Sequence, residues 1–424
     1  MKKTSLLPLL LLPFASYAQS EYPEVRTFRI LEFNDSTDYV ITLHENAPRL
    51  INTPDVPRFA LLGKEGKFYL GLGANIKATA NYDLGNPVSN PNLFVTSAIP
   101  MTKAPGNGGQ FQFSAQQSNI YLNVVALPGT KDQLGAYVSF NFLGDNYTPF
   151  LQHAYLKYRG ITAGYTYSLF TDAAAGPATI DYEGPNAFTA VIHGMVGYEA
   201  SFGYKKGWKA GIGLDMPNNS FTNATHTATV TQRVPDIPFY IQRNWANGNG
   251  WLRLSGIIRN LYYRNETAQK NIDKVGWGVK ASGTTPIYGG LSAYYQAVYG
   301  EGIASYIQDL TGCGMDLMPD PSDPSAMNPV KAWAAFGSLQ YNFTPKFFCT
   351  ATYSQVRTYA DRYGDSSVPW KTGYKYAQYI LANAFYNVSP IVQVGLEYIY
   401  GRRVDFGGSQ AHDNRLEAML QVSF

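Results

Sequence analysis

Side chains able to perform chemistry are widely scattered along this chain of 424 residues. A hydrolase would need a nucleophile, a base and an orienting group close together. No Gly-x-Ser-x-Gly motif is present, and a lone histidine is more often a structural hydrogen-bonding group than a base. The five histidines lie far apart in the sequence, at His44, His153, His193, His226 and His412. We therefore expect a protein without enzymatic activity.

Metal and cofactor motifs are equally weak. The aspartates Asp316, Asp320 and Asp323 lie close enough in sequence to hold Ca²⁺, but prolines interrupt them and their spacing does not match an EF-hand loop. A solvated loop is the simpler interpretation. The two cysteines, Cys313 and Cys349, are too few for a zinc module or a disulfide scaffold, and we predict no disulfide between them. The sequence predicts no cofactor and no bound metal.

The charged residues suggest a different chemistry. Basic side chains recur on the polar face of alternating segments, at Lys77, Lys157, Arg159, Arg253, Arg259, Lys280, Arg403 and Arg415. Acidic side chains gather in the connection 171–187, at Asp172, Asp181 and Glu183. Acids and bases on opposite walls of a pore create a transverse field, and a guanidinium binds a carboxylate through two parallel hydrogen bonds. This pattern predicts a charged constriction for small solutes.

The residues proposed for this constriction are Asp172, Asp181, Glu183, Lys77, Arg259, Lys280, Arg403 and Arg415. We prefer Arg259, Lys280 and Arg415 among the bases, because they should lie nearer the middle of the wall than Arg159 or Arg253. The alternative for each single residue is a solvated group or an internal salt bridge without a role in transport.

Strands must position these charges, because the alternation has a period of two residues. From Phe68 to Asn81, apolar residues alternate strictly with glycine or polar residues, and the same pattern recurs up to Phe424. The 40 Gly, 33 Tyr and 23 Phe suit strands, turns and interfaces better than helices. A formal net charge of only +3 gives no reason to expect nucleic acid as a partner.

Sixteen strands are predicted, at 66–82, 109–127, 131–144, 149–159, 160–170, 188–204, 206–217, 235–245, 249–264, 272–284, 288–302, 328–343, 346–360, 372–386, 391–405 and 410–424. One set of connections is short, at 128–130, 204–207, 246–248, 285–286, 344–345 and 389–390. The other set is longer, at 83–108, 171–187, 218–234, 265–271, 303–327 and 361–371. Bacterial outer-membrane barrels show this asymmetry, with short periplasmic turns and long external loops.

The fold class depends on which face of the strands is apolar. A sheet in lipid must close on itself, because unpaired backbone groups at an edge cost several kcal/mol each. The polar face carries Gly, Asn, Gln, Ser, Lys, Arg and Glu, as a water-filled lumen requires. Aromatic residues fall at strand ends, at Tyr82, Phe150, Tyr158, Tyr341, Phe343, Tyr386, Tyr400 and Phe424. We predict an all-β transmembrane antiparallel barrel; the alternative is a large secreted β-sandwich or propeller, for which the propeller repeats are missing.

The N-terminus predicts export. Lys2 and Lys3 precede an apolar run from Leu6 to Phe14, and Ser16-Tyr17-Ala18 forms a cleavage site. We therefore assign 1–18 to a signal peptide, 19–65 to a periplasmic extension and 66–424 to the barrel. The expected location is the outer membrane of a Gram-negative bacterium.

Several segments resemble DcaP-like outer-membrane porins. They are 374–379, 385–390, 393–398, 401–403 and 413–416, with further landmarks at 181–186 and 233–238. The resemblance covers roughly residues 66–424. It implies a trimeric sixteen-stranded porin, with a preference in some members for small anions such as dicarboxylates. It also implies that the loop between the fifth and sixth strands, 171–187, folds inward and narrows the pore. The family's better-known members carry a coiled-coil-like prefix, whereas 20–65 lacks heptads.

The expected function is passive diffusion of small hydrophilic solutes. The expected partners are these solutes, outer-membrane lipid, two further copies of the chain and the barrel-assembly machinery, which reads the terminal Phe424. The first alternative is a structural or adhesive barrel with a blocked lumen. The second is a transporter of hydrophobic ligands, which would need an apolar plug or pocket that the polar face does not favour.

Overall fold

The computed structural model describes residues 26–32, 35–41, 59–62, 67–102, 109–363 and 373–423. The predicted signal peptide and the terminal Phe424 lie outside them. The chain divides into two units, residues 1–45 and 46–424. In the first unit, β1 (Arg26–Glu32) and β2 (Asp35–Ile41) form an antiparallel two-stranded sheet.

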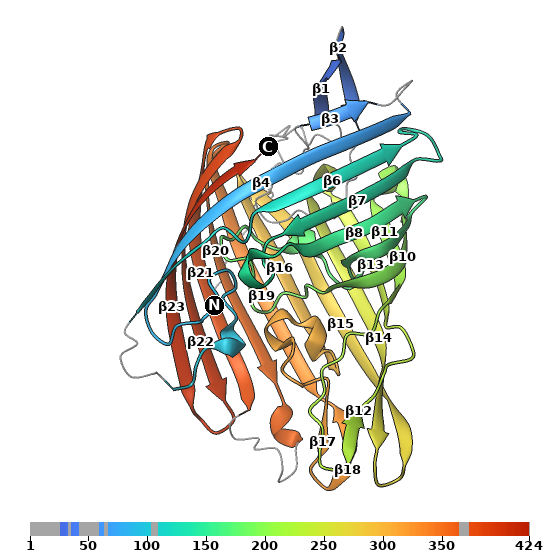
Figure 1. Cartoon of the computed structure of the whole chain (residues 1–424), viewed down its shortest axis with the longest axis vertical. Coiled ribbons are helices and arrows are strands. Elements are labelled where there is room, and N and C mark those ends of the chain that lie inside the picture. The colour runs from blue at the N-terminus through green and yellow to red at the C-terminus, as the bar shows by residue number, and fades with distance from the viewer. Residues whose placement is uncertain are drawn as a thin grey trace, which may run out of the picture. The chain divides into compact units, whose positions relative to one another are not determined.

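The second unit is a closed antiparallel barrel of sixteen wall positions within the described residues (Figure 1). Its strands are β3 (Phe59–Leu62), β4 (Phe68–Asp83), β5 (Gln110–Ser114), β6 (Asn119–Ala126), β7 (Leu134–Asn141), β8 (Phe150–Tyr158), β9 (Ile161–Tyr167), β10 (Ile192–Phe202), β11 (Trp208–Asp215), β12 (Thr227–Thr229), β13 (Ile237–Trp245), β14 (Gly250–Asn265), β15 (Lys270–Tyr288), β16 (Leu291–Glu301), β19 (Lys331–Thr344), β20 (Phe347–Thr358), β21 (Tyr374–Ser389), β22 (Val392–Asp405) and β23 (Gln410–Ser423). The barrel closes where β23 pairs with β4.

Three wall positions contain two strand segments each. The predicted strand 109–127 is interrupted at 115–118, so that β5 and β6 both pair with β4. Similarly, β12 and β13 both pair with β14. The short strand β3 pairs with Tyr69–Leu72 of β4, beyond the end of β23, and thus adds a piece of wall from the segment predicted as periplasmic extension.

The predicted alternation is confirmed along the strands. On β23, Leu416 and Leu420 are about half exposed on the outer face, whereas Arg415 and Glu417 are buried on the inner face. Apolar side chains exposed in this way on successive strands would be unfavourable in water but match the acyl chains of a bilayer. No helix among the described residues has the length and apolar character needed to cross a bilayer.

The predicted turn at 285–286 is wrong. Strand β15 continues to Tyr288, with a bulge at Pro286 that lets the strand run through the proline. The chain reverses instead at Gly289 and Gly290, whose φ angles are +55° and +91°. Two successive residues with positive φ match the twist of a tight hairpin, and glycine adopts this conformation without steric cost.

The connections at the other end of the barrel are longer, and several of them turn into its interior. They contain η2 (Thr96–Ala98), η3 (Asp145–Tyr147), η4 (Ala173–Ala175), η7 (Ala304–Tyr306), η8 (Gln308–Leu310), η9 (Ala360–Arg362) and the hairpin β17 (Leu317–Asp320) with β18 (Asp323–Pro329). The short connections contain η5 (Tyr204–Lys206) and η6 (Ala246–Gly248). Phe170, Phe188 and Leu310 from the long connections pack against Phe336 and Val356 of the wall. Part of the inner face is therefore apolar, in contrast to the uniformly polar lumen expected from sequence.

Candidate functional site

The connection between β9 and β10, residues 168–191, is the inward-folded loop. Its backbone contacts the inner face of strands far away in the sequence. The Ala187 amide donates to Ser354 of β20, and Gln296 of β16 donates to the Ala187 carbonyl. The Asn383 amide on β21 donates to the Ala178 carbonyl. The loop thus lies along the wall from β14 round to β4, as the next contacts show.

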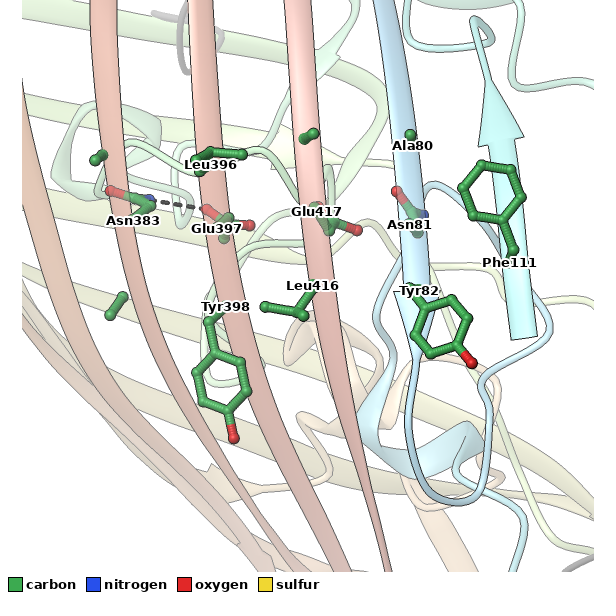
Figure 2. A pocket seen from close by; sticks show the side chains of 13 residues that line it. Ala80, Asn81, Tyr82, Phe111, Asn383, Leu396, Glu397, Tyr398, Leu416 and Glu417 are labelled. Atoms are coloured by element: carbon green, nitrogen blue, oxygen red, sulfur yellow. Dashed lines mark hydrogen bonds between the residues drawn. The ribbon is translucent and has the colours of Figure 1, made fainter. Parts of the chain in front are cut away.

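Glu397 of β22 binds the backbone of this loop. Its two carboxylate oxygens accept the backbone amides of Ile180 and Asp181, each at 2.8 Å. Asn383 donates to the same carboxylate at 2.8 Å (Figure 2). From β4, the Lys77 ammonium donates to the Ile180 carbonyl at 2.9 Å. Three of these bonds fix the tip of the loop against the wall, and the bond from Asn383 orients the Glu397 carboxylate.

Asp181 joins the inward loop to its neighbours. Its carboxylate accepts the Phe94 amide at 2.9 Å, the Gly184 amide at 3.2 Å and the Tyr379 hydroxyl at 3.1 Å. Phe94 belongs to the connection after β4, so one carboxylate orders two loops. Burial raises the pKa of the neighbouring Glu183 carboxyl to about 8, and the charges of Asp181 and Asp309 add to this rise. A buried carboxyl among other acids favours its neutral form.

Asp172 and Lys280 hold the first part of the loop. Asp172 accepts hydrogen bonds from Ser282 at 2.7 Å and from the Trp251 indole at 3.1 Å. The Lys280 ammonium donates to the Phe170 carbonyl and to Thr189, one at each end of the loop. Both side chains are buried, and they lie within electrostatic range of each other. Asp172 thus ties the loop to side chains of the wall, and Lys280 ties the wall to the loop.

Arg259 uses all five of its N–H donors inside the protein. It forms ion pairs with Asp236 and Asp316, both at 3.0 Å. Its remaining donors bind the carbonyls of Gly302 and Asn218 and the side chain of Asn219. These partners come from the connections after β11 and β16. Arg259 therefore ties two external loops to β14.

Arg415 and Arg403 have similar structural partners. Arg415 forms a bidentate pair with Asp83, at 2.6 and 3.0 Å, and also donates to the Val88 carbonyl. Arg403 pairs with Asp405 at 3.0 Å and donates to the Ser97 carbonyl. Both arginines hold the connection after β4.

The predicted residues thus form separate groups within the barrel. Lys77, Asp181 and Arg415 lie within electrostatic range of one another, and Glu183 is beside Asp181. Asp172 and Lys280 form a second group, whereas Arg259 and Arg403 have their own partners. All except Arg403 are at most 8% exposed. Their observed contacts are with loops, so the facing acidic and basic walls expected from sequence are not formed by these side chains.

Other inward charges are more accessible. We call Lys157, Glu199, Lys209 and Arg253 the periplasmic cluster, because each lies near the short-turn end of its strand, on β8, β10, β11 and β14. Lys209 pairs with Glu199 at 2.9 Å, and the Arg253 guanidinium lies 4.1 Å from the centre of the Tyr240 ring. The side chains of Glu199, Lys209 and Arg253 are 12–19% exposed.

Sequence reasoning missed two members of the periplasmic cluster. The alternation placed Lys157 and Arg253 inward but ranked Arg253 below Arg259, and it did not select Glu199 or Lys209. Lys209 follows the same inward alternation as Gly211, Gly213 and Asp215, which was the available signal. Burial of the preferred residues by loops could not be read from that pattern.

Two further expectations are corrected, those for Arg159 and Asp316, whereas His193 has the structural surroundings expected of a lone histidine. Arg159 does not face the lumen: it has a φ of +47° in a turn and pairs with Asp132, with both side chains 56% exposed. Asp316 is buried in its pair with Arg259, away from a solvated loop. His193 is also buried, with Nε2 3.1 Å from the Asp215 carboxylate, which accepts Ser168 as well.

A closed sixteen-stranded barrel with an inward loop and an apolar outer face defines an outer-membrane porin. A family model described as "Porin subfamily" matches residues 112–400. The chain belongs to this family, which places it in the outer membrane of a Gram-negative bacterium. Its fold is similar to that of the outer-membrane channel DcaP.

Solved structures share the fold. The outer-membrane channel DcaP of Acinetobacter baumannii superposes with a TM-score of 0.72 at 21% identity, covering 86% of this chain and 100% of that one. OmpF of Salmonella typhi gives 0.52 at 13% identity, covering 86% and 100%. OmpT of Vibrio cholerae gives 0.52 at 11% identity, with the same coverage. No curated protein sequence matches the chain.

Proposed function

We propose that this porin passes small hydrophilic anions, of dicarboxylate type, by passive diffusion through a water-filled barrel with a charged constriction. The observation that supports this selectivity is the composition of the periplasmic cluster. Its three cations face the carboxylate of Glu199, with Asp172 at 3.9 Å from Arg253. A small excess of accessible positive charge favours anions without binding them tightly.

In this proposal most buried charges shape the constriction, the periplasmic cluster selects the solute, and Glu183 adds a negative charge when it is ionised. Lys77 and Glu397 fix the tip of the inward loop, and Asp172 with Lys280 fixes its start. Arg259, Arg403 and Arg415 order the other loops. A lumen whose walls are held by such contacts keeps a constant width, so solutes are selected by size as well as charge.

Single-channel recording in planar bilayers tests the proposal. We expect steady open currents and a reversal potential of the sign that indicates anion preference in a salt gradient. A silent barrel would favour the structural or adhesive alternative, and cation preference would contradict the choice of anionic solutes. The second alternative, a transporter of hydrophobic ligands, predicts uptake of apolar compounds with little ionic current.

The double substitution Lys157→Ala with Lys209→Ala should weaken anion preference. Two unit charges 4 Å apart interact by about 1 kcal/mol in water, which corresponds to roughly a fivefold change in local ion concentration. We therefore expect the anion-to-cation permeability ratio to fall about fivefold. Lys346→Ala, in the periplasmic turn after β19, is a control that should leave the ratio unchanged. An unaltered anion-to-cation permeability ratio in the double variant would show that the periplasmic cluster does not determine the selectivity.

The pKa of Glu183 predicts a pH dependence. Because this pKa is about 8 in the folded protein, Glu183 is neutral at lower pH and gains a negative charge as pH rises through 8. Anion preference should therefore decline between about pH 7 and 9. Folded stability should also decline from pH 4.5 to 8, since the unfolded carboxyl ionises first. The anion preference of Glu183→Gln, measured from the reversal potential, should decline less over this pH range than that of the wild type. Equal pH profiles of the two proteins would contradict the assignment of the decline to Glu183.

We also propose a homotrimer, with residues 1–18 removed on export, the part of 19–65 that precedes β3 in the periplasm and the C-terminal strand read by the assembly machinery. The resemblance to DcaP-like porins supports the trimer. Crosslinking of the folded protein in detergent would test it by giving three-chain products.

A further inference from the structure

The outer face of β20–β23 changes sharply from apolar to polar. Cross-strand pairing aligns Ala351, Ala382, Tyr398 and Leu416 in one outward row. The next outward row towards the long loops contains Tyr353, Ile380, Tyr400 and Asn414. The row beyond it contains Gln355, Gln378, Arg402 and His412, which we call the polar row. The change occurs within four residues along each strand, or about 13 Å.

Two arginines occupy this polar surface without a counter-charge. Arg402 lies in the polar row, and Arg357 lies one outward row further, opposite Tyr376. Among the described residues, neither forms an ion pair, whereas Arg259 and Arg415 on the inner face each pair with a carboxylate. Within the described part of the chain, the Nε of Arg357 has no hydrogen-bond partner, and its guanidinium lies 5.3 Å from the centre of the Tyr359 ring. Among the same residues, no carboxylate neutralises either of these two guanidiniums next to the bilayer.

Neutral side chains hold Arg402 in place. Its guanidinium donates to the side-chain oxygens of Gln378 and Gln410. Gln378 in turn donates to the Tyr353 hydroxyl at 3.0 Å, and that hydroxyl donates to Gln355 at 2.8 Å. This network of neutral partners orients the guanidinium while it leaves the positive charge unneutralised.

An apolar groove lies on the same outer face, nearer the short turns. It has a volume of about 550 Å³, and the residues that line it include Ala80 (Figure 2), Ala382 and Ala418. The exposed side chains around it are Leu396, Tyr398, Leu416, Tyr82 and Phe111. A molecule with acyl chains in this groove would place its headgroup near Arg402, because Tyr398 and Arg402 are four residues apart on β22.

We propose that the polar row and Arg357 bind the headgroup of a phosphorylated lipid of the outer leaflet, with an acyl chain in the groove below. A guanidinium binds phosphate through two parallel N–H donors, which makes Arg well suited to this headgroup. Arg357 and Arg402 stand two strands apart, roughly 12 Å including their offset along the strands. This spacing fits two phosphates on one sugar headgroup, and exposed His412 adds a third donor beside Arg402.

Native mass spectrometry of the detergent-solubilised full-length protein tests this site with bisphosphorylated lipid A as the probe. We expect wild-type protein to bind it at least tenfold more tightly than dephosphorylated lipid A. R357Q/R402Q should lose this preference and keep its single-channel conductance. The matched control is R243Q, which removes an exposed arginine of the outer face near the periplasmic turn 203–207 and should keep the preference.

Four results would overturn the proposal. The first is equal binding of the two lipids by wild-type protein, and the second is an equal loss of preference in R243Q. The third is displacement of lipid A by millimolar inorganic phosphate, which would show a general phosphate site. If R357Q/R402Q instead changes the number of chains per complex, this face is an interface between copies of the chain and the lipid assignment fails.

Discussion

Replacing Arg259 by Ala is expected to lower the free energy of unfolding by about 3–5 kcal/mol, because it leaves two buried carboxylates unpaired. Asp236 and Asp316 are both fully buried, and each is 3.0 Å from the Arg259 guanidinium. The substitution also removes the donors to the Gly302 and Asn218 carbonyls, so the connections after β11 and β16 should detach from β14. Urea unfolding of the protein in lipid vesicles measures the loss, and limited proteolysis detects the freed loops.

Arg264→Ala is the matched control for this experiment, because Arg264 lies on the same strand and is 28% exposed. Its ion pair with Glu266 spans 3.8 Å, and exposed pairs of this kind contribute at most about 1 kcal/mol. Arg259→Met separates the contributions of charge and packing to the free energy of unfolding. It keeps most of the buried side-chain volume but still leaves both aspartates unpaired. Equal unfolding profiles for Arg259→Ala and Arg264→Ala would contradict the conclusion that Arg259 holds the two loops to the wall.

Replacing Glu397 by Ala should release the tip of the inward loop. The change removes the acceptor for the Ile180 and Asp181 amides, and hydrogen bonds to charged groups contribute about 1.5–3 kcal/mol each. Loss of two such bonds shifts the equilibrium between attached and detached loop by roughly two orders of magnitude or more. We expect larger and noisier single-channel currents, because the detached tip no longer holds a fixed position in the lumen.

Glu397→Gln provides a graded comparison. The amide keeps one acceptor oxygen, so its current noise should fall between that of the wild type and that of Glu397→Ala. The Asp320→Asn variant changes a half-buried residue at the end of β17, which has no contact with the inward loop among the described residues, and should behave as the wild type. If currents through Glu397→Ala are as steady as those of the wild type, other contacts such as that of Lys77 with the Ile180 carbonyl suffice to hold the loop.

The barrel itself was predictable because its signal is local. In a strand, successive side chains point to opposite faces, so the period of two identifies both the element and its buried face. The alternation from Phe68 to Asn81 and in the last strand predicted outward Leu416 and inward Arg415, and the structure has both. The number of wall positions followed from counting such segments. The bounds of β15 were missed, because Pro286 was interpreted as a turn residue although a bulge accommodates it.

The site was less predictable because its contacts are between distant residues. Alternation correctly placed Arg259, Lys280 and Arg415 on the inner face. It could not show that Asp236 and Asp316, 23 and 57 residues away from Arg259, would meet its guanidinium. Nor could it show that Glu397 binds the backbone of the inward loop, since the Ile180 amide lies 217 residues earlier in the chain.

The sequence by itself determined that this chain forms a closed barrel with apolar residues towards the membrane, because that property depends on the order of neighbouring residues. Only the tertiary structure decided which inward charges are covered by folded-in loops and which, like Lys209 and Glu199, remain accessible. The physical reason is burial: the same charged side chain acts as a structural tie when a loop covers it and contributes to the field of the lumen when water reaches it.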